Sequence, residues 1–268
     1  MADPLDLSGK VVIVTGGCRG VGRGIATRFL EAGADVVICC RHEPDEPPSA
    51  NGRTAAFVEA DVRDADQIDR VVAFTTEQFG RLDVLVNNAG GSPPADSATA
   101  SPKFSTAIIT LNLISPLLFA QRANTVMQEQ PDGGVIINIS SVSGVRPSPG
   151  TAAYGAAKAG LINLTQTLAV DWAPKVRVNA VTAGLVRTEQ SHLFYGDEEG
   201  IAAVGATVPL GRMAEPSDIA DVCLFLASPL ARYVSGESIT VHGGGERPAY
   251  QDAAKNTQTP ANKPARKD

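Results

Sequence analysis

The sequence predicts a doubly wound α/β fold of the Rossmann type, a three-layer α/β/α sandwich in which a seven-stranded parallel sheet lies between two layers of helices. Three observations support this prediction. Seven short runs rich in β-branched residues are spaced along the chain, longer segments of helical periodicity separate them, and the short runs are almost continuously apolar. Such strands are typical of a parallel sheet covered on both faces, and right-handed crossovers place the helices on those faces.

Predicted strands and helices alternate along the chain. The strands are expected at residues 11–14, 36–38, 56–58, 84–86, 135–137, 176–178 and 238–241. The helices are expected at about 21–32, 64–79, 103–129, 154–172 and 217–228. The connection over 43–52 contains three prolines and a glycine. We therefore expect the helix between the second and third strands to be short or missing.

The chain is long enough to form one substantial core. Its 268 residues are 43% hydrophobic and 19% charged, which is typical of a globular domain. We expect a single Rossmann-type domain over 1–248, with a loop at about 185–213 that lines the substrate site. Residues 249–268 contain no large apolar residue after Tyr250, so they are expected to form a disordered tail.

The charge and the cysteines exclude several classes of protein. A net charge of −6 without a basic stripe argues against nucleic acid as a partner. Neither a signal peptide nor a run of about 18 apolar residues is found, so export and membrane spanning are disfavoured. No metal site is expected, because the four cysteines lack ligand spacing. Cys18, Cys39, Cys40 and Cys223 are instead interpreted as reduced, mostly buried thiols of a cytoplasmic protein.

A glycine-rich segment, Thr15–Gly22, follows the first predicted strand and opens the first helix. Gly16, Gly20 and Gly22 allow a tight turn, a close approach to a pyrophosphate and a helix N-terminus directed at the anion. The alternative is a tight turn without a ligand. Its position between strand and helix favours a dinucleotide site.

The end of the second strand bears on the choice of cofactor. A carboxylate there would bind the ribose hydroxyls of NAD(H), but this strand ends Cys39-Cys40-Arg41. Arg41 and Arg19 are able to clamp a 2′-phosphate by charge-assisted hydrogen bonds, which favours NADP(H). The alternative is that both arginines are solvated, with Glu43 and Asp45 neutralising Arg41, so NAD(H) stays possible.

From about residue 7 to residue 245 the chain resembles the single-domain short-chain dehydrogenase/reductase family. The matching motifs are TGGCRGVG at 15–22, Asp61-Val62, NNAG at 87–90, Asn112, SSVSG at 140–144, YGAAK at 154–158 and NAVTAGLVRT at 179–188. The resemblance implies an oxidoreductase that interconverts a secondary alcohol and a ketone with a nicotinamide cofactor.

Tyr154 and Lys158 lie four residues apart at the start of a predicted helix, so both side chains can reach one site. A free phenol has a pKa near 10, and we expect the lysine ammonium to lower it toward neutrality. Tyr154 would then act as general acid and base. By resemblance, Lys158 also holds the nicotinamide ribose, and Ser141 hydrogen-bonds the substrate oxygen. Ser141 is chosen on its spacing from Tyr154, and its neighbours Ser140 and Ser143 are the alternatives.

Asn112 interrupts an apolar helical run. By resemblance it anchors water in a proton relay to Lys158; the alternative is a capping or core amide that only needs partners for its polar atoms. Asp61 and Val62 resemble the pair that contacts adenine, although an acidic residue there could cap the helix expected at Asp64.

The resemblance and the glycine turn together define a set of cofactor residues. They are Gly16, Cys18, Arg19, Gly20, Val21, Gly22, Arg41, Asp61, Val62, Asn88, Ala89, Gly90, Tyr154, Lys158, Ala183, Gly184, Val186 and Thr188. Two positions depart from the family pattern: Ala183 stands where a proline usually precedes the glycine, and His242 replaces a common acidic residue. We interpret His242 as structural or interfacial rather than as a pH switch.

The substrate wall is expected in the loops after the strands, at 91–104, 142–150 and 185–213. Leu185, Leu193, Phe194 and Tyr195 in the last loop favour an apolar ketone or alcohol of steroid-like or cyclic shape. Residues 196–200 are interpreted as a mobile lid, and the alternative is a flexible surface segment that does not gate the site. The alternatives are a 3-oxoacyl-thioester reductase and a non-catalytic NADP(H)-binding regulator.

Two predicted helical segments, 108–127 and 154–172, are apolar over more of their circumference than one buried face requires. This favours subunit packing, and by resemblance a homotetramer. A larger internal core is the alternative.

Overall fold

The structure is a computed structural model that describes residues 3–246, 248 and 250. It contains the predicted seven-stranded sheet, in the order β5-β2-β1-β6-β7-β8-β9, with every neighbouring pair parallel. The strands are β1 Val11–Thr15, β2 Asp35–Cys40, β5 Ala56–Glu59, β6 Val84–Asn87, β7 Gly134–Ser141, β8 Val176–Ala183 and β9 Ser238–Val241. The predicted disordered tail at 249–268 lies outside the described residues apart from Tyr250.

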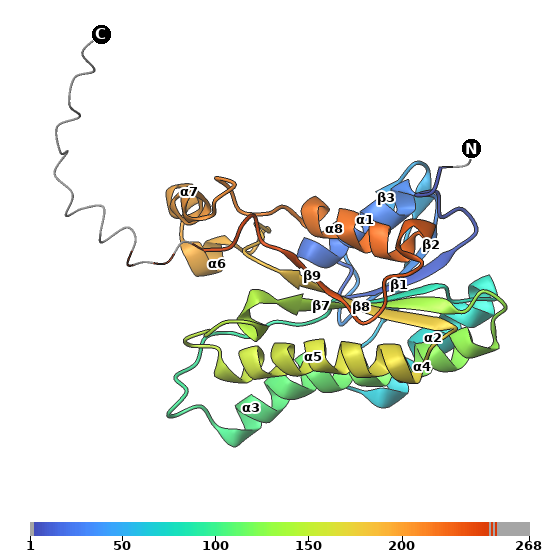
Figure 1. The fold of residues 1–268 in the computed structure, drawn as a ribbon, viewed down its shortest axis with the longest axis horizontal. Helices are drawn as coiled ribbons and strands as arrows, with labels where there is room; N and C mark the ends of the chain where they lie inside the picture. The colour runs from blue at the N-terminus through green and yellow to red at the C-terminus, as the bar shows by residue number, and fades with distance from the viewer. Residues whose placement is uncertain (1–2, 247, 249, 251–268) are drawn as a thin grey trace, which may run out of the picture.

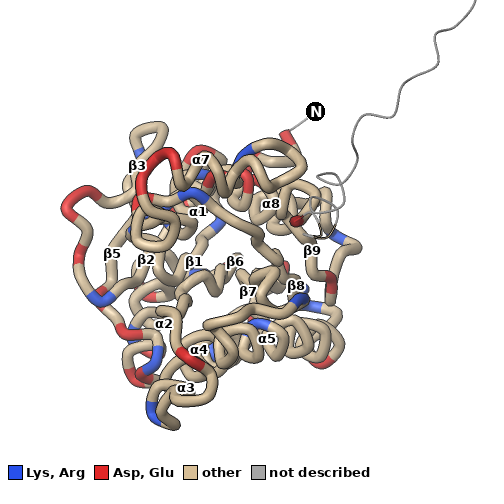
Figure 2. The backbone as a smooth tube through the Cα atoms, turned by 90° about the vertical axis from the view of Figure 1, so that its left-hand side faces the viewer, with Lys and Arg blue, Asp and Glu red and all other residues tan. Residues whose placement is uncertain are grey.

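Helices cover both faces of the sheet, which confirms the predicted three-layer α/β/α fold (Figure 1). One layer contains α1 Gly20–Glu31 and α8 Pro216–Ala227. The other contains α2 Ala65–Phe79, α4 Ser115–Glu129 and α5 Ala152–Asp171. Each layer buries its own apolar cluster against the sheet, with Phe29 central to one cluster and Phe119 to the other. Figure 2 shows the charged residues mainly around the rim of this sandwich.

The predicted helix over 103–129 is continuous but not uniform. It consists of α3 Pro102–Ile109, a π-helical turn η1 Thr110–Ile114 and α4. Asn112 is buried in the π turn, and its Nδ2 donates to the carbonyl of Ile108 at 2.9 Å. Single π turns inside α-helices frequently occur at functional sites.

The helical stretch Pro102–Glu129 is apolar and long enough to cross a membrane by length and composition alone. Core helices of globular proteins share this length and composition. Here α4 packs on β6, β7 and α2, and α3 packs on α5. These contacts bury part of the apolar surface of the stretch.

The proline-rich connection forms no helix, as expected. It contains a short antiparallel hairpin, β3 Ser49–Ala50 and β4 Arg53–Thr54. Asn51 and Gly52 have φ angles of 51° and 76°, which are typical of a two-residue hairpin turn. The remaining short elements are α6 His192–Tyr195, α7 Glu198–Thr207, and the 3₁₀ turns η2 Val142–Gly144 and η3 Pro229–Ala231.

The order of the strands places a cleft at the carboxyl ends of β1 and β6. The chain passes from β1 to β2 on one side and returns to β6 on the other, which defines a topological switch point. The glycine turn sits there, packed on the loop that follows β6. A Cβ atom on Gly22 would lie 2.3 Å from the carbonyl oxygen of Gly16.

We predict that Gly22→Ala destabilises the protein by about 1–3 kcal/mol, because the added methyl group collides with backbone that cannot move freely. Urea unfolding monitored by circular dichroism measures the change. The control is Gly160→Ala inside α5, whose Cβ would lie 3.1 Å from the flexible end of Leu113. It should be neutral or stabilise the protein by up to about 1 kcal/mol, because alanine is favoured over glycine inside a helix. Equal stability of the two variants would contradict the tight packing of the turn.

Candidate active site

A cavity of about 620 Å³ opens at the carboxyl ends of the strands. Its wall includes the glycine turn, the end of β2, the loop after β6, the end of β7, the start of α5 and the segment after β8. Every predicted cofactor residue lines it, as do Ser141, Tyr154 and Lys158. Asn112 is the one predicted site residue that does not.

The glycine turn brings the N-terminus of α1 to the cavity. Arg19 is the N-cap residue of α1, and its side chain forms no capping hydrogen bond. Gly16 and Gly20 have φ angles of 65° and 52°, a conformation that favours glycine. The turn therefore combines backbone N–H groups with room for an anion, and these residues fit a dinucleotide pyrophosphate.

The loop after β6 is joined to this turn through Thr15. The Thr15 hydroxyl accepts hydrogen bonds from the backbone N–H groups of Asn88 and Ala89, both at 2.9 Å. The Asn88 side chain donates in return to the Thr15 carbonyl at 2.9 Å. Asn87, by contrast, is buried and donates to Asn138 Oδ1 at 2.9 Å and to Pro116 O at 3.1 Å. Asn87 thus supports the sheet rather than the cavity.

The end of the cavity beside the glycine turn and β2 is rich in arginine. Arg19 and Arg41 are exposed there, and within the part of the chain that the structure describes neither forms an ion pair, including with Glu43 or Asp45. Asp61 is held by Arg63, whose Nε donates to Oδ1 at 2.9 Å. The hydrogen bond from Arg63 lowers the pKa of Asp61.

Arg63 at this end of the cavity was not among the predicted site residues. Its position two residues after Asp61 was the feature of the sequence that could have identified it. Asp61 does not cap α2; Asp64 does so, accepting from the N–H of Asp66 at 3.0 Å and of Gln67 at 3.3 Å.

Tyr154 and Lys158 lie one turn apart near the start of α5, as predicted, and both line the cavity. The Lys158 Nζ atom lies 5.7 Å from the centre of the Tyr154 ring. It donates to the Ile139 carbonyl of β7 at 2.7 Å. Ser141 ends β7 on the same wall, near enough to Tyr154 for its hydroxyl to lower the pKa of the phenol. Three groups suited to proton transfer therefore converge on one site.

The expected shift of the Tyr154 pKa toward neutrality is wrong for this structure. Burial raises the pKa of Tyr154, and the Ser141 hydroxyl only partly opposes that rise. Burial also lowers the pKa of Lys158 to about 8. The physical reason is that the site desolvates both charged forms, while the ammonium is directed to the Ile139 carbonyl.

Asn112 lies behind the cavity wall and holds the loop after β6. Its Oδ1 accepts from Gly91 N at 2.9 Å, and its Nδ2 donates to Gly91 O at 3.0 Å. A Cβ atom on Gly90 would lie 2.7 Å from Oδ1 of Asn112 and 3.3 Å from Nζ of Lys158. Asn112 therefore positions the segment beside Lys158, and its part in a proton relay stays a prediction.

Ala183 ends β8, and the next residues form the far wall of the cavity. Gly184 N donates to Val241 O at 2.9 Å. A Cβ atom on Gly184 would lie 2.7 Å from the Cβ of His242, so the histidine packs directly over this glycine. Thr188 N donates to Ser191 Oγ at 2.9 Å, which orients the start of the 185–213 segment.

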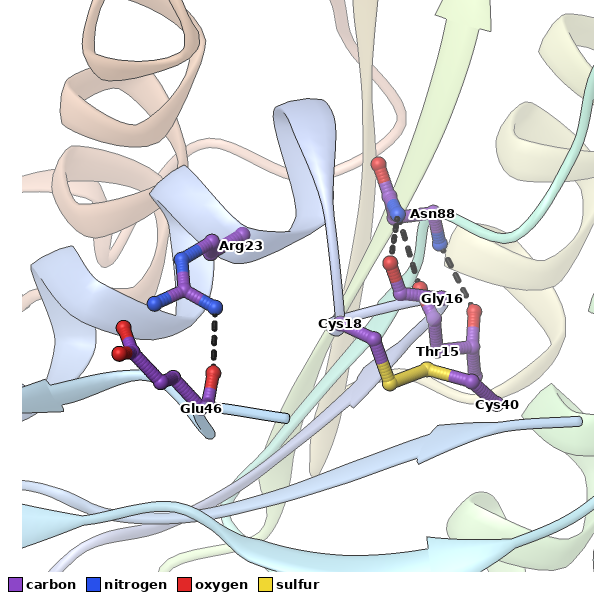
Figure 3. The surroundings of a disulfide bond; sticks show 7 residues. All are labelled: Thr15, Gly16, Cys18, Arg23, Cys40, Glu46 and Asn88. Atoms are coloured by element: carbon purple, nitrogen blue, oxygen red, sulfur yellow. Dashed lines mark hydrogen bonds between the residues drawn. A yellow bond between two sulfur atoms is a disulfide. The ribbon is translucent and has the colours of Figure 1, made fainter. Parts of the chain in front are cut away.

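The expectation of four reduced thiols is wrong for two of them. Cys18 and Cys40 form a disulfide bond between the glycine turn and the end of β2 (Figure 3). The available signal was parallel pairing, because β1 and β2 end side by side with Thr15 opposite Cys39. Cys39 and Cys223 are free and buried, and burial raises the pKa of both thiols.

Among the described residues, no cluster of His, Cys, Asp or Glu is arranged to hold a metal ion.

The fold and the cavity together define a Rossmann-type oxidoreductase. Residues 16–246 match the family model described as enoyl-(acyl carrier protein) reductase. The chain is 36% identical to a 3alpha-hydroxysteroid dehydrogenase of Mediterraneibacter gnavus, over 88% of this chain and 97% of the relative. It is 38% identical to the L-rhamnose 1-dehydrogenase (NAD(P)(+)) of Azotobacter vinelandii, over 88% and 96%. It is 35% identical to a 3-oxoacyl-[acyl-carrier-protein] reductase of Synechocystis, over 89% and 97%.

The ligand-free aldohexose dehydrogenase of Thermoplasma acidophilum has a similar structure, with a TM-score of 0.82 and 31% identity over 97% of this chain and 99% of that one. The chain belongs to the short-chain dehydrogenase/reductase family of oxidoreductases. Members of this family act on small molecules at CH–OH groups with NAD(P)(H).

We predict that the lowered pKa of Lys158 makes wild-type stability depend on pH relative to Lys158→Met. The folded state gives up the lysine proton near pH 8, whereas the unfolded state keeps it to about 10.5. The free-energy cost of burying the charged lysine in the folded state is therefore complete below pH 8 and decreases as pH rises toward 10.5. Between pH 7 and 9.5, urea unfolding should show wild type gaining about 2 kcal/mol on the variant. A constant difference would contradict the assigned burial.

Proposed function

We propose that this protein is an NADP(H)-preferring dehydrogenase/reductase that interconverts a secondary alcohol and a ketone, with Tyr154 as general acid and base. The observation that carries the proposal is that Ser141, Tyr154 and Lys158 share one wall of a cavity whose other end is the glycine turn. A non-catalytic regulator would not need these three groups together.

Nicotinamide, when bound, supplies the hydride for reduction or accepts it in oxidation. The Tyr154 hydroxyl gives its proton to the ketone oxygen, or takes the alcohol proton in the reverse direction. Ser141 holds that oxygen by a hydrogen bond. Lys158, with its pKa near 8, is largely charged at neutral pH and stabilises the phenolate that proton donation leaves. Its ammonium also binds the nicotinamide ribose.

The arginines support the preference for NADP(H). Arg19 and Arg41 enter the cavity from the glycine turn and from the residue after β2. Two guanidinium groups are able to bind a 2′-phosphate by charge-assisted hydrogen bonds. No carboxylate ends β2, where one would favour the ribose hydroxyls of NAD(H).

An apolar substrate body of steroid-like or cyclic shape fits the 185–213 segment best. Leu185, Phe194 and Tyr195 line the cavity beside the catalytic wall, and the hydroxysteroid dehydrogenase relative is consistent with this choice. The second candidate is a 3-oxoacyl-thioester reductase, favoured by the family model and by the Synechocystis relative. We propose that residues 196–200, which follow α6 and include the first turn of α7, act as a lid.

We further propose a cytoplasmic homotetramer. Ile109, Ile114 and Val170 are exposed on the α3–η1–α4 and α5 layer, where α4 and α5 lie side by side (Figure 1). Exposed aliphatic side chains on neighbouring helices are typical of subunit interfaces.

Tyr154→Phe should lower kcat about 10²–10⁴-fold, because the proton donor is lost while the apolar ring stays. NADPH-dependent reduction of a panel of steroid, cyclic and 3-oxoacyl-thioester ketones measures the loss and identifies the substrate class. NADPH affinity should remain within about twofold. The control is Tyr233→Phe, at a fully exposed tyrosine. Undiminished turnover in Tyr154→Phe would remove Tyr154 from the mechanism.

Arg41→Ala should weaken NADPH binding about tenfold or more while leaving NADH binding nearly unchanged, because one charge-assisted hydrogen-bond partner of the 2′-phosphate is removed. Fluorescence titration with both cofactors gives the two affinities. Arg53→Ala serves as control, since Arg53 pairs with Asp35 at 2.8 Å outside the cavity. Equal losses for both cofactors would contradict the preference for NADP(H).

A further inference from the structure

The Cys18–Cys40 disulfide crosses the adenosine end of the cavity. Cys18 lies in the glycine turn immediately before Arg19, and Cys40 is the last residue of β2, immediately before Arg41. The Cα atoms of the two cysteines are 6.5 Å apart. Figure 3 shows the bond joining the two segments beside Thr15 and Gly16. The bond therefore ties together the two backbone segments that carry the arginines proposed to bind the 2′-phosphate.

This cysteine pair differs from the other two thiols in its access to solvent. Cys18 and Cys40 are half-buried and line the cavity, whereas Cys39, which also borders it, is fully buried. Cys39 points into the core cluster between the sheet and α2, and Cys223 is buried in α8. A reagent that enters the cavity consequently meets Cys18 and Cys40, whereas Cys223 is closed to it.

We propose that the Cys18–Cys40 pair is a redox switch that sets the affinity of the cavity for the adenosine 2′-phosphate portion of NADP(H). The disulfide form binds it weakly and the dithiol form binds it tightly. This inference rests on the proposed function, because it assigns regulation to the same cofactor site.

Geometry gives the direction of the effect. A disulfide holds its two sulfur atoms about 2.0 Å apart, whereas unbonded side-chain atoms in contact lie about 4 Å apart. Reduction thus allows the glycine turn and the end of β2 to separate where the ribose phosphate must fit between Arg19 and Arg41. The free thiols can also donate weak hydrogen bonds to ribose oxygens, which a disulfide cannot do.

The switch needs an external oxidant, and we assign this role to a small-molecule disulfide such as oxidised glutathione. One cysteine thiolate attacks the small disulfide and releases a thiolate; the second cysteine then attacks the mixed disulfide and releases the other. Two electrons pass from the protein to the reagent, and the two cysteine protons end on the two released thiols. A small dithiol such as dithiothreitol reverses the exchange.

The test compares cofactor affinity in the two redox states. Full-length protein is poised with oxidised glutathione or with dithiothreitol, and alkylation followed by mass spectrometry reports the state of Cys18 and Cys40. Calorimetry then measures the binding of NADPH and of adenosine 2′,5′-bisphosphate. We expect both ligands to bind at least about tenfold more weakly to the disulfide form, and reduced nicotinamide mononucleotide, which lacks the adenosine portion, to bind the two forms equally.

Cysteine variants identify which residues cause the change in cofactor affinity. In Cys18→Ser the affinity ratio between the two redox conditions should be about one, since no bond can form. Cys223→Ser retains Cys18 and Cys40 and should keep the tenfold difference. A redox response that survives in Cys18→Ser would assign the effect to another group and overturn the proposal.

Two further outcomes would also overturn the switch. One is equal or tighter binding to the disulfide form, with the bond verified by mass; the other is a bond that does not form at any ratio of oxidised to reduced glutathione. Failure of the dithiol form to bind either NADPH or the bisphosphate would instead reject the proposed cofactor site itself.

Discussion

The geometry of the cavity depends on the hydrogen bonds that Thr15 makes between β1 and the loop after β6. The Thr15 hydroxyl accepts from the N–H groups of Asn88 and Ala89, while the Asn88 side chain donates to the Thr15 carbonyl. One end of this connection carries the glycine turn and the N-terminus of α1. The other continues to Gly90, which lies against Asn112 and Lys158. The anion end and the acid–base end are therefore held at a fixed separation by buried backbone and amide groups.

Desolvation sets the chemical character of the acid–base end. It raises the pKa of the Tyr154 phenol and lowers that of the Lys158 ammonium. Ser141 partly opposes the rise at Tyr154. In the proposed mechanism the phenol gives its proton to a substrate oxygen, and the charge left on Tyr154 is attracted by the ammonium beside its ring in surroundings of low dielectric.

Most of the fold follows from patterns that are local in sequence. Apolar runs of three or four residues predicted the positions of the strands, and the prolines of the 43–52 connection predicted that the helix there would be short or missing. The shared wall of Tyr154 and Lys158 followed from their four-residue spacing. The π turn at Asn112 was not predicted from the helical periodicity, and the hydrogen bonds that Asn112 makes there reach Gly91, 21 residues earlier in the chain.

Neither the disulfide nor the directions of the pKa shifts could be predicted from the sequence, and the reason is the same for both. Cys18 and Cys40 come together only through the register of β1 with β2. The opposing pKa shifts depend on how deeply α5 buries its first turn, and on the Ile139 carbonyl that receives the lysine. Spacing in the sequence predicts which side chains lie close together, but how much solvent reaches those side chains depends on the packing of the whole structure.

A crystal structure of the protein with NADPH and a ketone identified by the panel tests the central claim most directly. The account predicts that the Tyr154 hydroxyl donates a hydrogen bond to the ketone oxygen while the nicotinamide C4 lies roughly 3–3.5 Å from the carbonyl carbon. A nicotinamide ring bound elsewhere, or a carbonyl group beyond the reach of Tyr154, would contradict it.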